Sequence, residues 1–305
     1  MKILITGIHG FVGTNLVRAL SKDNIIYGLD IVAPMKDGVQ HTFGWDQIDD
    51  IPMVDAIIHL AGMAHDTKNQ TKANVYFKVN TELTKTIYDY FLQSSAKKFI
   101  FFSSVKAAAD KVVGDFVDES VTPSPKGPYG ESKIAAEKYI ESKMGKDTYI
   151  LRPCMIHGPG NKGNLNLLYG VVSKGIPWPL GAFENKRTFM SIDNLCYIIS
   201  NLLTKDVKSG IYHVNDDEPV STNELIEIIC DSMGKKPHIW HIPKGLMIGF
   251  AKLGGWLHLP LNTERLQKLT ENYISSNSKI KKAIGIEKMP VRAKDGLKKT
   301  IISFQ

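Results

Sequence analysis

Short apolar segments alternate with longer segments of helical periodicity along the first half of the chain. Within residues 11–21, Val12, Leu16, Ala19 and Leu20 recur at the spacing that places them on one face of a helix. Strands that alternate with helices in this way pair into a parallel sheet, which the helices cover on both faces. The pattern therefore predicts a doubly wound α/β fold. The predicted strands are Lys2–Thr6, Ile25–Asp30, Ala56–Leu60, Phe99–Ser103 and Tyr149–Leu151, and the predicted helices include 11–21 and 81–93.

Right-handed crossovers between parallel strands give such a sheet a Rossmann-like order. The alternation ends near residue 155, because 157–164 is glycine-rich loop and 175–183 is interrupted by proline. A helical segment at 193–203 and a strand-like segment at 210–214 follow, and we expect them to return to the first sheet. The expected division is a Rossmann-like domain of residues 1–155 plus about 187–215 and a smaller C-terminal lobe of about 156–186 plus 216–305.

The composition is that of a globular protein with a substantial core, since 43% of the residues are hydrophobic and 23% are charged. The three cysteines, Cys154, Cys196 and Cys230, are too few for a disulfide framework and too widely spaced for a zinc ribbon or a CxxC motif. We therefore expect a reducing, cytoplasmic location and no metal site.

Most of the net charge of +7 lies near the C-terminus, where residues 279–299 hold eight basic and two acidic residues and so carry +6. Only five of the 38 basic residues are arginine, the residue favoured for reading bases and clamping phosphates. We expect a solvated basic face and no nucleic-acid partner. Contact of this stretch with an anionic partner or a membrane surface stays open.

The most apolar segment, Leu246–Leu259, has only 14 residues and contains Lys252. A membrane-spanning helix needs roughly 20 apolar residues, so no integral membrane span is expected. The segment is predicted to be a buried or groove-lining helix, with an interfacial membrane helix as the alternative.

A glycine-rich turn joins the first predicted strand to the first predicted helix, with glycines at positions 7, 10 and 13. Such glycines permit a tight turn and close approach of the backbone to a pyrophosphate, which the free N–H groups and positive dipole end of a helix N-terminus attract. This arrangement predicts dinucleotide binding. The residues expected to contact the dinucleotide here are Gly7, His9, Gly10, Phe11, Val12 and Gly13.

Asp30 stands at the end of the second predicted strand, 23 residues after Gly7, where an acceptor for the ribose hydroxyls belongs. A carboxylate there binds the 2′-hydroxyl of NAD and repels the 2′-phosphate of NADP. The next residues, Ile31, Val32 and Ala33, supply no compensating cation. The sequence therefore predicts NAD as the cofactor.

Tyr129 and Lys133 are four residues apart just before a helical pattern at 134–143, and at this i,i+4 spacing their side chains share one face. A phenol has a pKa near 10 and is a poor base at neutral pH. A nearby ammonium group and a nicotinamide cation would lower that pKa, and we expect Tyr129 to act as the proton shuttle of a dehydrogenase-like reaction.

Together these features resemble the extended short-chain dehydrogenase/reductases, above all the NAD-dependent epimerase/dehydratase family. The resemblance covers nearly the whole chain. It rests on TGIHGFVG (6–13), Asp30, HLAG (59–62), Asn80, FFSS (101–104), YGESK (129–133), LRP…HGPGN (151–161) and NKRTFMSIDN (185–194).

The resemblance implies an NAD-dependent enzyme with Ser104, Tyr129 and Lys133 as catalytic residues, Ser103 being the less favoured serine. Ser104 would bond the reacting sugar oxygen, and Lys133 would hold the nicotinamide ribose. Asn80 would have a structural or proton-relay role. The other residues that the family pattern places at the cofactor are Ile31, Leu60, Ala61 and Gly62.

The family's C-terminal lobe binds a nucleoside-diphosphate sugar. Arg187 matches its diphosphate-binding arginine, Arg265 is a second, weaker match, and Asn164 falls where an amide lies near the phosphates. Lys106, also expected to contact substrate, stands where 4,6-dehydratases carry a carboxylate. Met155 stands where epimerases often have asparagine.

The favoured function is an NAD-dependent 4-epimerase of a nucleotide sugar, a UDP-hexose or UDP-N-acetylhexosamine, acting by transient hydride transfer at C4. The first alternative is an NAD(P)H-dependent 4-reductase of UDP-4-keto-6-deoxy sugars in surface polysaccharide biosynthesis. A non-catalytic, dinucleotide-sensing regulator and an enzyme of non-sugar alcohols are the others. Family members often pair through two helices per subunit, so a homodimer is expected.

Overall fold

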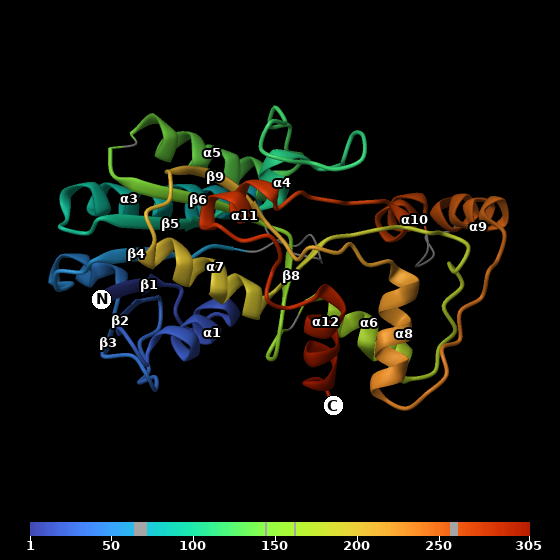
Figure 1. Cartoon of the computed structure of the whole chain (residues 1–305). Helices are drawn as coiled ribbons and strands as arrows, with labels where there is room; N and C mark the ends of the chain where they lie inside the picture. The colour runs from blue at the N-terminus through green and yellow to red at the C-terminus, as the bar shows by residue number, and fades with distance from the viewer. Residues whose placement is uncertain (64–71, 144, 162, 257–261) are drawn as a thin grey trace.

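A seven-stranded parallel sheet forms the centre of the larger part of the molecule (Figure 1). The computed structural model describes residues 1–63, 72–143, 145–161, 163–256 and 262–305. The strand order is β3-β2-β1-β4-β5-β6-β9, a doubly wound order that confirms the predicted Rossmann-like α/β fold. The strands are β1 (Lys2–Thr6), β2 (Ile25–Leu29), β3 (His41–Phe43), β4 (Ala56–His59), β5 (Lys98–Phe102), β6 (Asp147–Pro153), β7 (Met155–His157), β8 (Phe189–Ser191) and β9 (Gly210–Val214).

Helices cover both faces of this sheet, α3 and α5 on one and α1 and α7 on the other (Figure 1). The α-helices are α1 (Phe11–Leu20), α2 (Ala73–Tyr76), α3 (Leu83–Gln93), α4 (Val105–Ala108), α5 (Pro128–Ser142), α6 (Asn164–Ser173), α7 (Ile192–Thr204), α8 (Thr222–Ser232), α9 (Lys244–Trp256), α10 (Thr263–Thr270), α11 (Ser278–Ile284) and α12 (Ala293–Ile302). A 3-10 helix, η1 (Trp45–Asp50), and a π-helical stretch, η2 (Phe77–Glu82), complete the described helices.

The alternation of side chains along the central strands produces two cores. Ile3 and Ile5 of β1 point to the face that α1 and α7 cover, whereas Leu4 points to the face that α3 and α5 cover. All three are fully buried. A strand buried on both sides must be apolar at every position, which is why these strands read as continuous apolar segments in the sequence.

The C-terminal part forms its own apolar clusters outside the sheet. One joins α6, α8 and α12 through residues that include Leu165, Ile229 and Leu297, and a smaller one joins α9 and α10 through Met247 and Leu266. β7 and β8 pair in parallel as a separate two-stranded sheet. As expected, α7 and β9 return to the first sheet, and α11 also packs there. The division into two domains stays a prediction.

The predicted elements differ from the observed ones by one or two residues at several ends, and more clearly at three places. Three-residue β3 gave no recognisable apolar segment and was not predicted. β6 runs from Asp147 to Pro153, longer at both ends than the predicted strand. Helix α5 begins at Pro128, a favoured first helical residue, so that Tyr129 lies within the helix rather than before it.

None of the described helices is long and apolar enough to cross a membrane. The apolar segment Leu246–Leu259 falls within α9 as far as Trp256, and its last three residues lie outside the described part of the chain.

Candidate active site

The glycine turn leads from β1 into α1 with the geometry that a dinucleotide requires. Gly7 has a positive φ of 67°, and a Cβ there would lie 2.9 Å from the backbone nitrogen of Ala61. A Cβ at Gly13 would lie 2.7 Å from the carbonyl oxygen of Gly7. Gly10 is the N-cap residue of α1 and has no side chain to cap the first-turn N–H groups, which include those of Phe11 and Val12.

A buried polar network joins this turn to the loop after β4. Thr6 Oγ1 accepts hydrogen bonds from the backbone N–H groups of Leu60 and Ala61, at 3.2 and 3.0 Å. His59 lies between Thr6 and Thr84, 2.7 and 2.9 Å from their hydroxyls. Since Thr84 donates its proton to the Asn80 carbonyl, His59 Nε2 donates to Thr84 and Nδ1 accepts from Thr6. Burial lowers the pKa of His59 to about 3, so it is neutral.

Asp30 follows β2 and lies beside the glycine turn. Its carboxylate accepts the backbone N–H of His9 at 3.0 Å and that of Ile31 at 2.7 Å. The three residues after Asp30 supply no cation, but the structure places Lys36 near this carboxylate. Lys36 interacts electrostatically with Asp30, and its Nζ donates a hydrogen bond to Thr14 Oγ1 at 2.8 Å. Burial and nearby Arg18 lower the pKa of Lys36.

Tyr129, Lys133 and Glu137 repeat every four residues along the buried face of α5. Lys133 Nζ donates to the Phe102 carbonyl at 2.9 Å and lies near Gly62, where a Cβ would approach it to 3.1 Å. Burial lowers the pKa of Lys133 to about 8, against the opposing effect of Glu137. The lysine therefore loses its charge at a much lower pH than an exposed lysine.

The two serines after β5 point to different partners. Ser104 is the N-cap residue of α4, and its side chain is hydrogen-bonded to that of Tyr129. Ser103 donates instead to Glu137, which is paired with fully buried Arg152 through a 2.5 Å contact. The geometry therefore places Ser104, and not Ser103, beside Tyr129.

The sequence predicts a pKa of Tyr129 that is lowered by Lys133 and a nicotinamide cation together. In the protein alone, burial raises the pKa of the partly buried Tyr129, while the hydrogen bond with Ser104 acts in the opposite direction. The Tyr129 ring also meets Tyr76 edge to face, with ring centroids 6.2 Å apart. Lys133 directs its ammonium toward the Phe102 carbonyl and the loop of Gly62.

The side chain of Asn80 links the loop at Gly62 to α5. Its Oδ1 accepts from the Met63 backbone N–H at 2.7 Å, and its Nδ2 donates to Ser132 Oγ at 3.0 Å. Ser132 in turn donates to the Tyr129 carbonyl at 2.9 Å. The side chain is fully buried, and all these contacts are structural.

Lys106 lies on α4 next to Ser104, but its side chain contacts protein groups. Its Nζ is 2.7 Å from the Asp110 carbonyl, 3.4 Å from the Asp110 carboxylate and 4.5 Å from the centre of the Tyr273 ring. The hydroxyl of Tyr273 donates to the Ala109 carbonyl at 2.7 Å. Tyr273 thus joins α4 to the C-terminal part of the molecule.

The same tyrosine pairs with the segment that carries Arg187. The backbone N–H of Tyr273 donates to the Lys186 carbonyl at 2.9 Å, and Arg187 Nε bonds the Glu271 carbonyl at 3.3 Å. Arg265 is exposed on α10, the helix that precedes Glu271. Asn164 is exposed at the first turn of α6. The structure thus brings Arg187 and α10 together, whereas Asn164 lies on a different helix, α6.

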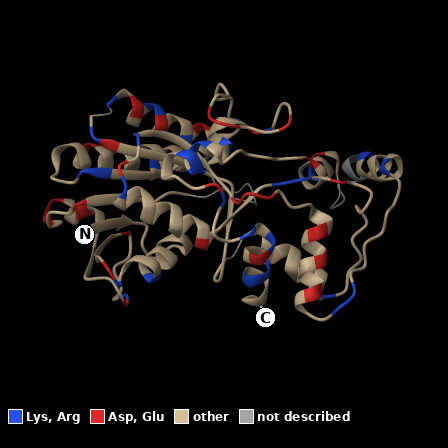
Figure 2. Cartoon of the chain, viewed as in Figure 1, with Lys and Arg blue, Asp and Glu red and all other residues tan. Residues whose placement is uncertain are grey.

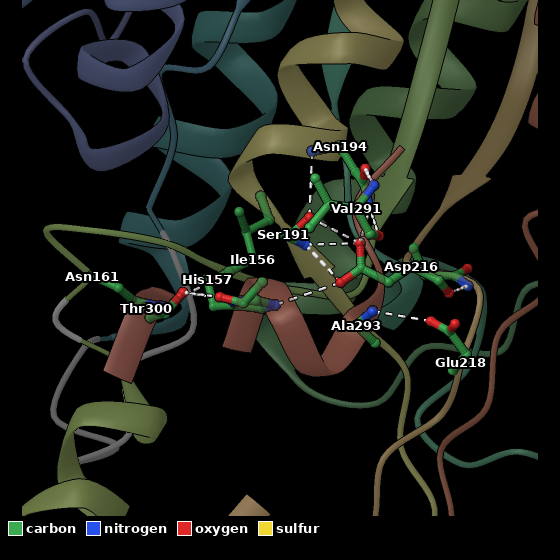
Figure 3. Close-up of polar contacts among 12 residues, drawn as sticks. Ile156, His157, Asn161, Ser191, Asn194, Asp216, Glu218, Val291, Ala293 and Thr300 are labelled. Carbon is green, nitrogen blue, oxygen red and sulfur yellow. Dashed lines mark hydrogen bonds and ion pairs between the residues drawn. The ribbon is translucent and has the colours of Figure 1, made fainter. Parts of the chain in front are cut away.

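Two matched motifs, HGPGN and NKRTFMSIDN, meet in the buried polar cluster of Figure 3. Asp216 accepts hydrogen bonds from the Ser191 backbone and hydroxyl at 3.0 to 3.1 Å and from Asn194 Nδ2 at 2.7 Å. His157 lies between Thr300, at 2.8 Å, and Asp216, at 3.6 Å. These residues tie β7, β8 and α7 to α12.

Sequence reasoning missed four residues of the site: Lys36, Glu137, Arg152 and Tyr273. Glu137 had a signal, because it continues the four-residue spacing of Tyr129 and Lys133. Arg152 stands in the matched LRP segment, but its contact with Glu137 is long-range, as are the contacts of Lys36 and Tyr273.

The residues around the glycine turn fit a dinucleotide. The turn places α1's N-terminus beside Asp30, and the buried Nε2 of His9 has no hydrogen-bond partner among the described residues. An oxygen of a bound phosphate or ribose would satisfy such an atom. No group of three or more His, Cys, Asp or Glu side chains in the described ranges could hold a metal ion.

Comparisons with known proteins agree with this geometry. The model of the NAD dependent epimerase/dehydratase family matches residues 3–215. The UDP-glucose 4-epimerase of Vibrio cholerae is 31% identical, over 99% of this chain and 95% of that protein. The N-acetyl-alpha-D-glucosaminyl-diphospho-ditrans,octacis-undecaprenol 4-epimerase of Escherichia coli O157:H7 is 27% identical, over 92% and 84%. The solved structure of the UDP-glucuronic acid 4-epimerase from Bacillus cereus in complex with NAD has the same fold, with a TM-score of 0.75 at 20% identity and coverage of 100% and 98%.

Proposed function

Because the chain belongs to the NAD-dependent epimerase/dehydratase family, we propose that it is an NAD-dependent 4-epimerase of a nucleotide sugar, a UDP-hexose or UDP-N-acetylhexosamine. The observation that carries the proposal is the hydrogen-bonded pair of Ser104 and Tyr129, with buried Lys133 on the same helix face. A regulator that only sensed the dinucleotide would have no need of this arrangement.

Each residue of that group has a distinct role in hydride chemistry at C4. NAD, when bound, accepts the C4 hydride and returns it. Ser104 donates a hydrogen bond to the sugar O4, and Tyr129 takes the proton of that hydroxyl and gives it back. Lys133 holds the nicotinamide ribose and, with its pKa near 8, keeps most of its charge at neutral pH.

The cofactor residues divide into two groups in this proposal. The turn residues Gly7, His9, Gly10, Phe11, Val12 and Gly13 enclose the pyrophosphate, and Asp30 with Ile31 contacts the adenosine ribose. Leu60, Ala61, Gly62 and Asn80 form the wall beside Lys133.

Arg187, Arg265 and Asn164 would bind the substrate diphosphate, and Lys106 would lie at the sugar end. Guanidinium groups suit a diphosphate, because they form paired, charge-assisted hydrogen bonds with its oxygens. Arg187 is supported best, since its segment is bonded to Tyr273, which contacts α4 beside Ser104. A homodimer in the cytoplasm completes the proposal.

A 4-reductase of UDP-4-keto-6-deoxy sugars is the second function to test, because Met155 departs from the epimerase pattern. Both reactions use the same three residues, so stoichiometry separates them. The purified protein is incubated with UDP-hexoses, UDP-N-acetylhexosamines and UDP-4-keto-6-deoxy sugars, with and without NADH. NMR identifies the product and absorbance follows the NADH band. An epimerase inverts C4 with no net change in NADH, whereas a reductase consumes one NADH per sugar.

A further inference from the structure

The outer face of α9 is apolar and exposed to solvent. Leu246, Phe250 and Leu253 follow one another at helical spacing and are 58%, 57% and 57% exposed. The adjacent face, with Met247 and Ala251, is buried against Leu180 and α10. The helix therefore has an apolar inner face that packs in the lobe and a second apolar face that does not.

The chain segment that carries this face has charges of one sign. Residues 232–263 contain four lysines and no acidic residue, and Lys244 and Lys252 are exposed on α9 itself. Figure 2 shows blue and no red along the segment that leads into α9. Trp240, just before the helix, is 55% exposed. Leucine and aromatic side chains with lysines beside them are the composition of helices that lie in a membrane interface.

The position of α9 leaves the face accessible. Figure 1 shows α9 and α10 together at the end of the molecule farthest from β2 and β3. Asn185 bonds the Leu269 carbonyl of α10 at 3.3 Å, and Arg187 bonds the Glu271 carbonyl just beyond it. A surface that received α9 would therefore lie close to the residues proposed for the substrate diphosphate.

We propose that α9 docks on the surface of an anionic phospholipid bilayer, with its axis in the plane of the interface and Leu246, Phe250 and Leu253 inserted. The helix has 13 residues, too few to span, and its charge complements anionic headgroups. A two-fold contact between copies through this face would place Lys244 and Lys252 near the same lysines of the other copy. That repulsion favours the lipid surface over a second copy. The proposal does not depend on the reaction.

Flotation with lipid vesicles tests the docking. The full-length protein is mixed with vesicles of equal parts phosphatidylglycerol and phosphatidylcholine, or of phosphatidylcholine alone. We expect the wild type to float with the anionic vesicles and added salt to weaken this binding. For Leu246→Glu/Phe250→Glu we expect the partition coefficient to fall by a factor of about ten or more. The matched control, Met53→Glu/Ile302→Glu, adds the same charges at exposed apolar positions on other elements and should float like the wild type.

Two further measurements keep the result interpretable. The α9 variant should retain the circular dichroism spectrum of the wild type and its activity on a water-soluble UDP-sugar, since no residue of the proposed active site is changed. Light scattering should give both proteins the same molar mass. No flotation with either vesicle, equal flotation of both variants, or a wild-type dimer that the α9 changes dissociate would overturn the proposal.

Discussion

At the scale of single residues, burial shifts the pKa values of two titratable side chains of α5, Lys133 and Tyr129. It lowers the pKa of Lys133 to about 8 and raises that of Tyr129, because in both cases the neutral form is favoured away from water. In the protein alone, Tyr129 is therefore protonated where Lys133 loses its charge, and the phenolate that accepts the sugar proton would be favoured by the positive charge of bound NAD.

The pH dependence of catalysis should show this difference. A lysine with a pKa of 8 is half charged at pH 8, where an ordinary lysine with a pKa of 10.5 is still fully charged. If the ammonium is needed at the ribose, kcat/KM falls as the pH rises through about 8. Lys133→Met should be slow and should lack this falling limb. A wild-type profile that stays level to about pH 10 would mean that Lys133 keeps its proton or is not needed.

Removing the Tyr129 hydroxyl should greatly lower turnover and leave cofactor binding nearly unchanged. For Tyr129→Phe we expect kcat to fall by roughly two to four powers of ten, the usual effect of losing an acid/base group, with NAD affinity nearly unchanged. Tyr139→Phe is the control on the same helix, because that hydroxyl bonds Asp89 away from Ser104. Near-normal turnover of Tyr129→Phe would show that the proton moves by another route.

Asp30 and Lys36 together should decide between NAD and NADP. The carboxylate repels a 2′-phosphate, whereas Lys36 would attract it once the carboxylate is gone. Calorimetry should show NAD bound more tightly than NADP by the wild type. For Asp30→Ala we expect NADP affinity to rise about tenfold or more, and Asp30→Ala/Lys36→Ala should lose that gain. Equal binding of both cofactors by the wild type would contradict the role given to Asp30.

At the scale of elements, a buried ion pair joins α5 to β6 of the sheet. Arg152 of β6 and Glu137 of α5 are both buried, and Ser103, after β5, donates to the same carboxylate. Breaking such a pair leaves a charge in the core without its partner. For Arg152→Met we expect a loss of about 3–5 kcal/mol in the free energy of unfolding, measured by urea denaturation.

Two comparisons make that result specific. Arg152→Met/Glu137→Met removes both charges and should recover much of the loss, since no unpaired charge remains. Lys143→Met breaks the exposed pair between Lys143, at the C-terminal end of α5, and Asp89 of α3, and should leave the midpoint nearly unchanged. If Arg152→Met were as stable as Lys143→Met, the buried pair would not be what holds α5 to β6.

Local signals explain which elements could be predicted. β1, α1 and β9 were found because strands buried on both faces and amphipathic helices leave clear patterns, and the glycine turn followed from its place between β1 and α1. The pairing of β3 with β2 left no such pattern. Likewise, Ser104 was preferred from a motif alignment, whereas the bond between Ser103 and Glu137 depends on a contact across 34 residues.

At the scale of the whole molecule, the predicted family and the Rossmann-like sheet are confirmed. The roles of the individual site residues stay predictions. The C-terminal part was harder to predict, because its helices pack through separate clusters and its strand-like segments are short. Tyr273 shows the consequence: it links α4 to the Arg187 segment, yet its own neighbourhood in the sequence contains no motif.

The fate of the C4 hydrogen tests the central claim most directly. A UDP-hexose with deuterium at C4 is converted in ordinary water, and the product is examined by NMR and mass spectrometry. If the protein removes the C4 hydride, holds the 4-keto sugar and returns the same hydride to the other face, the epimer appears with its deuterium retained at C4 and no net NADH forms. An epimer that has lost the label to solvent, or the absence of any C4 epimer across the UDP-sugar panel, would contradict the account.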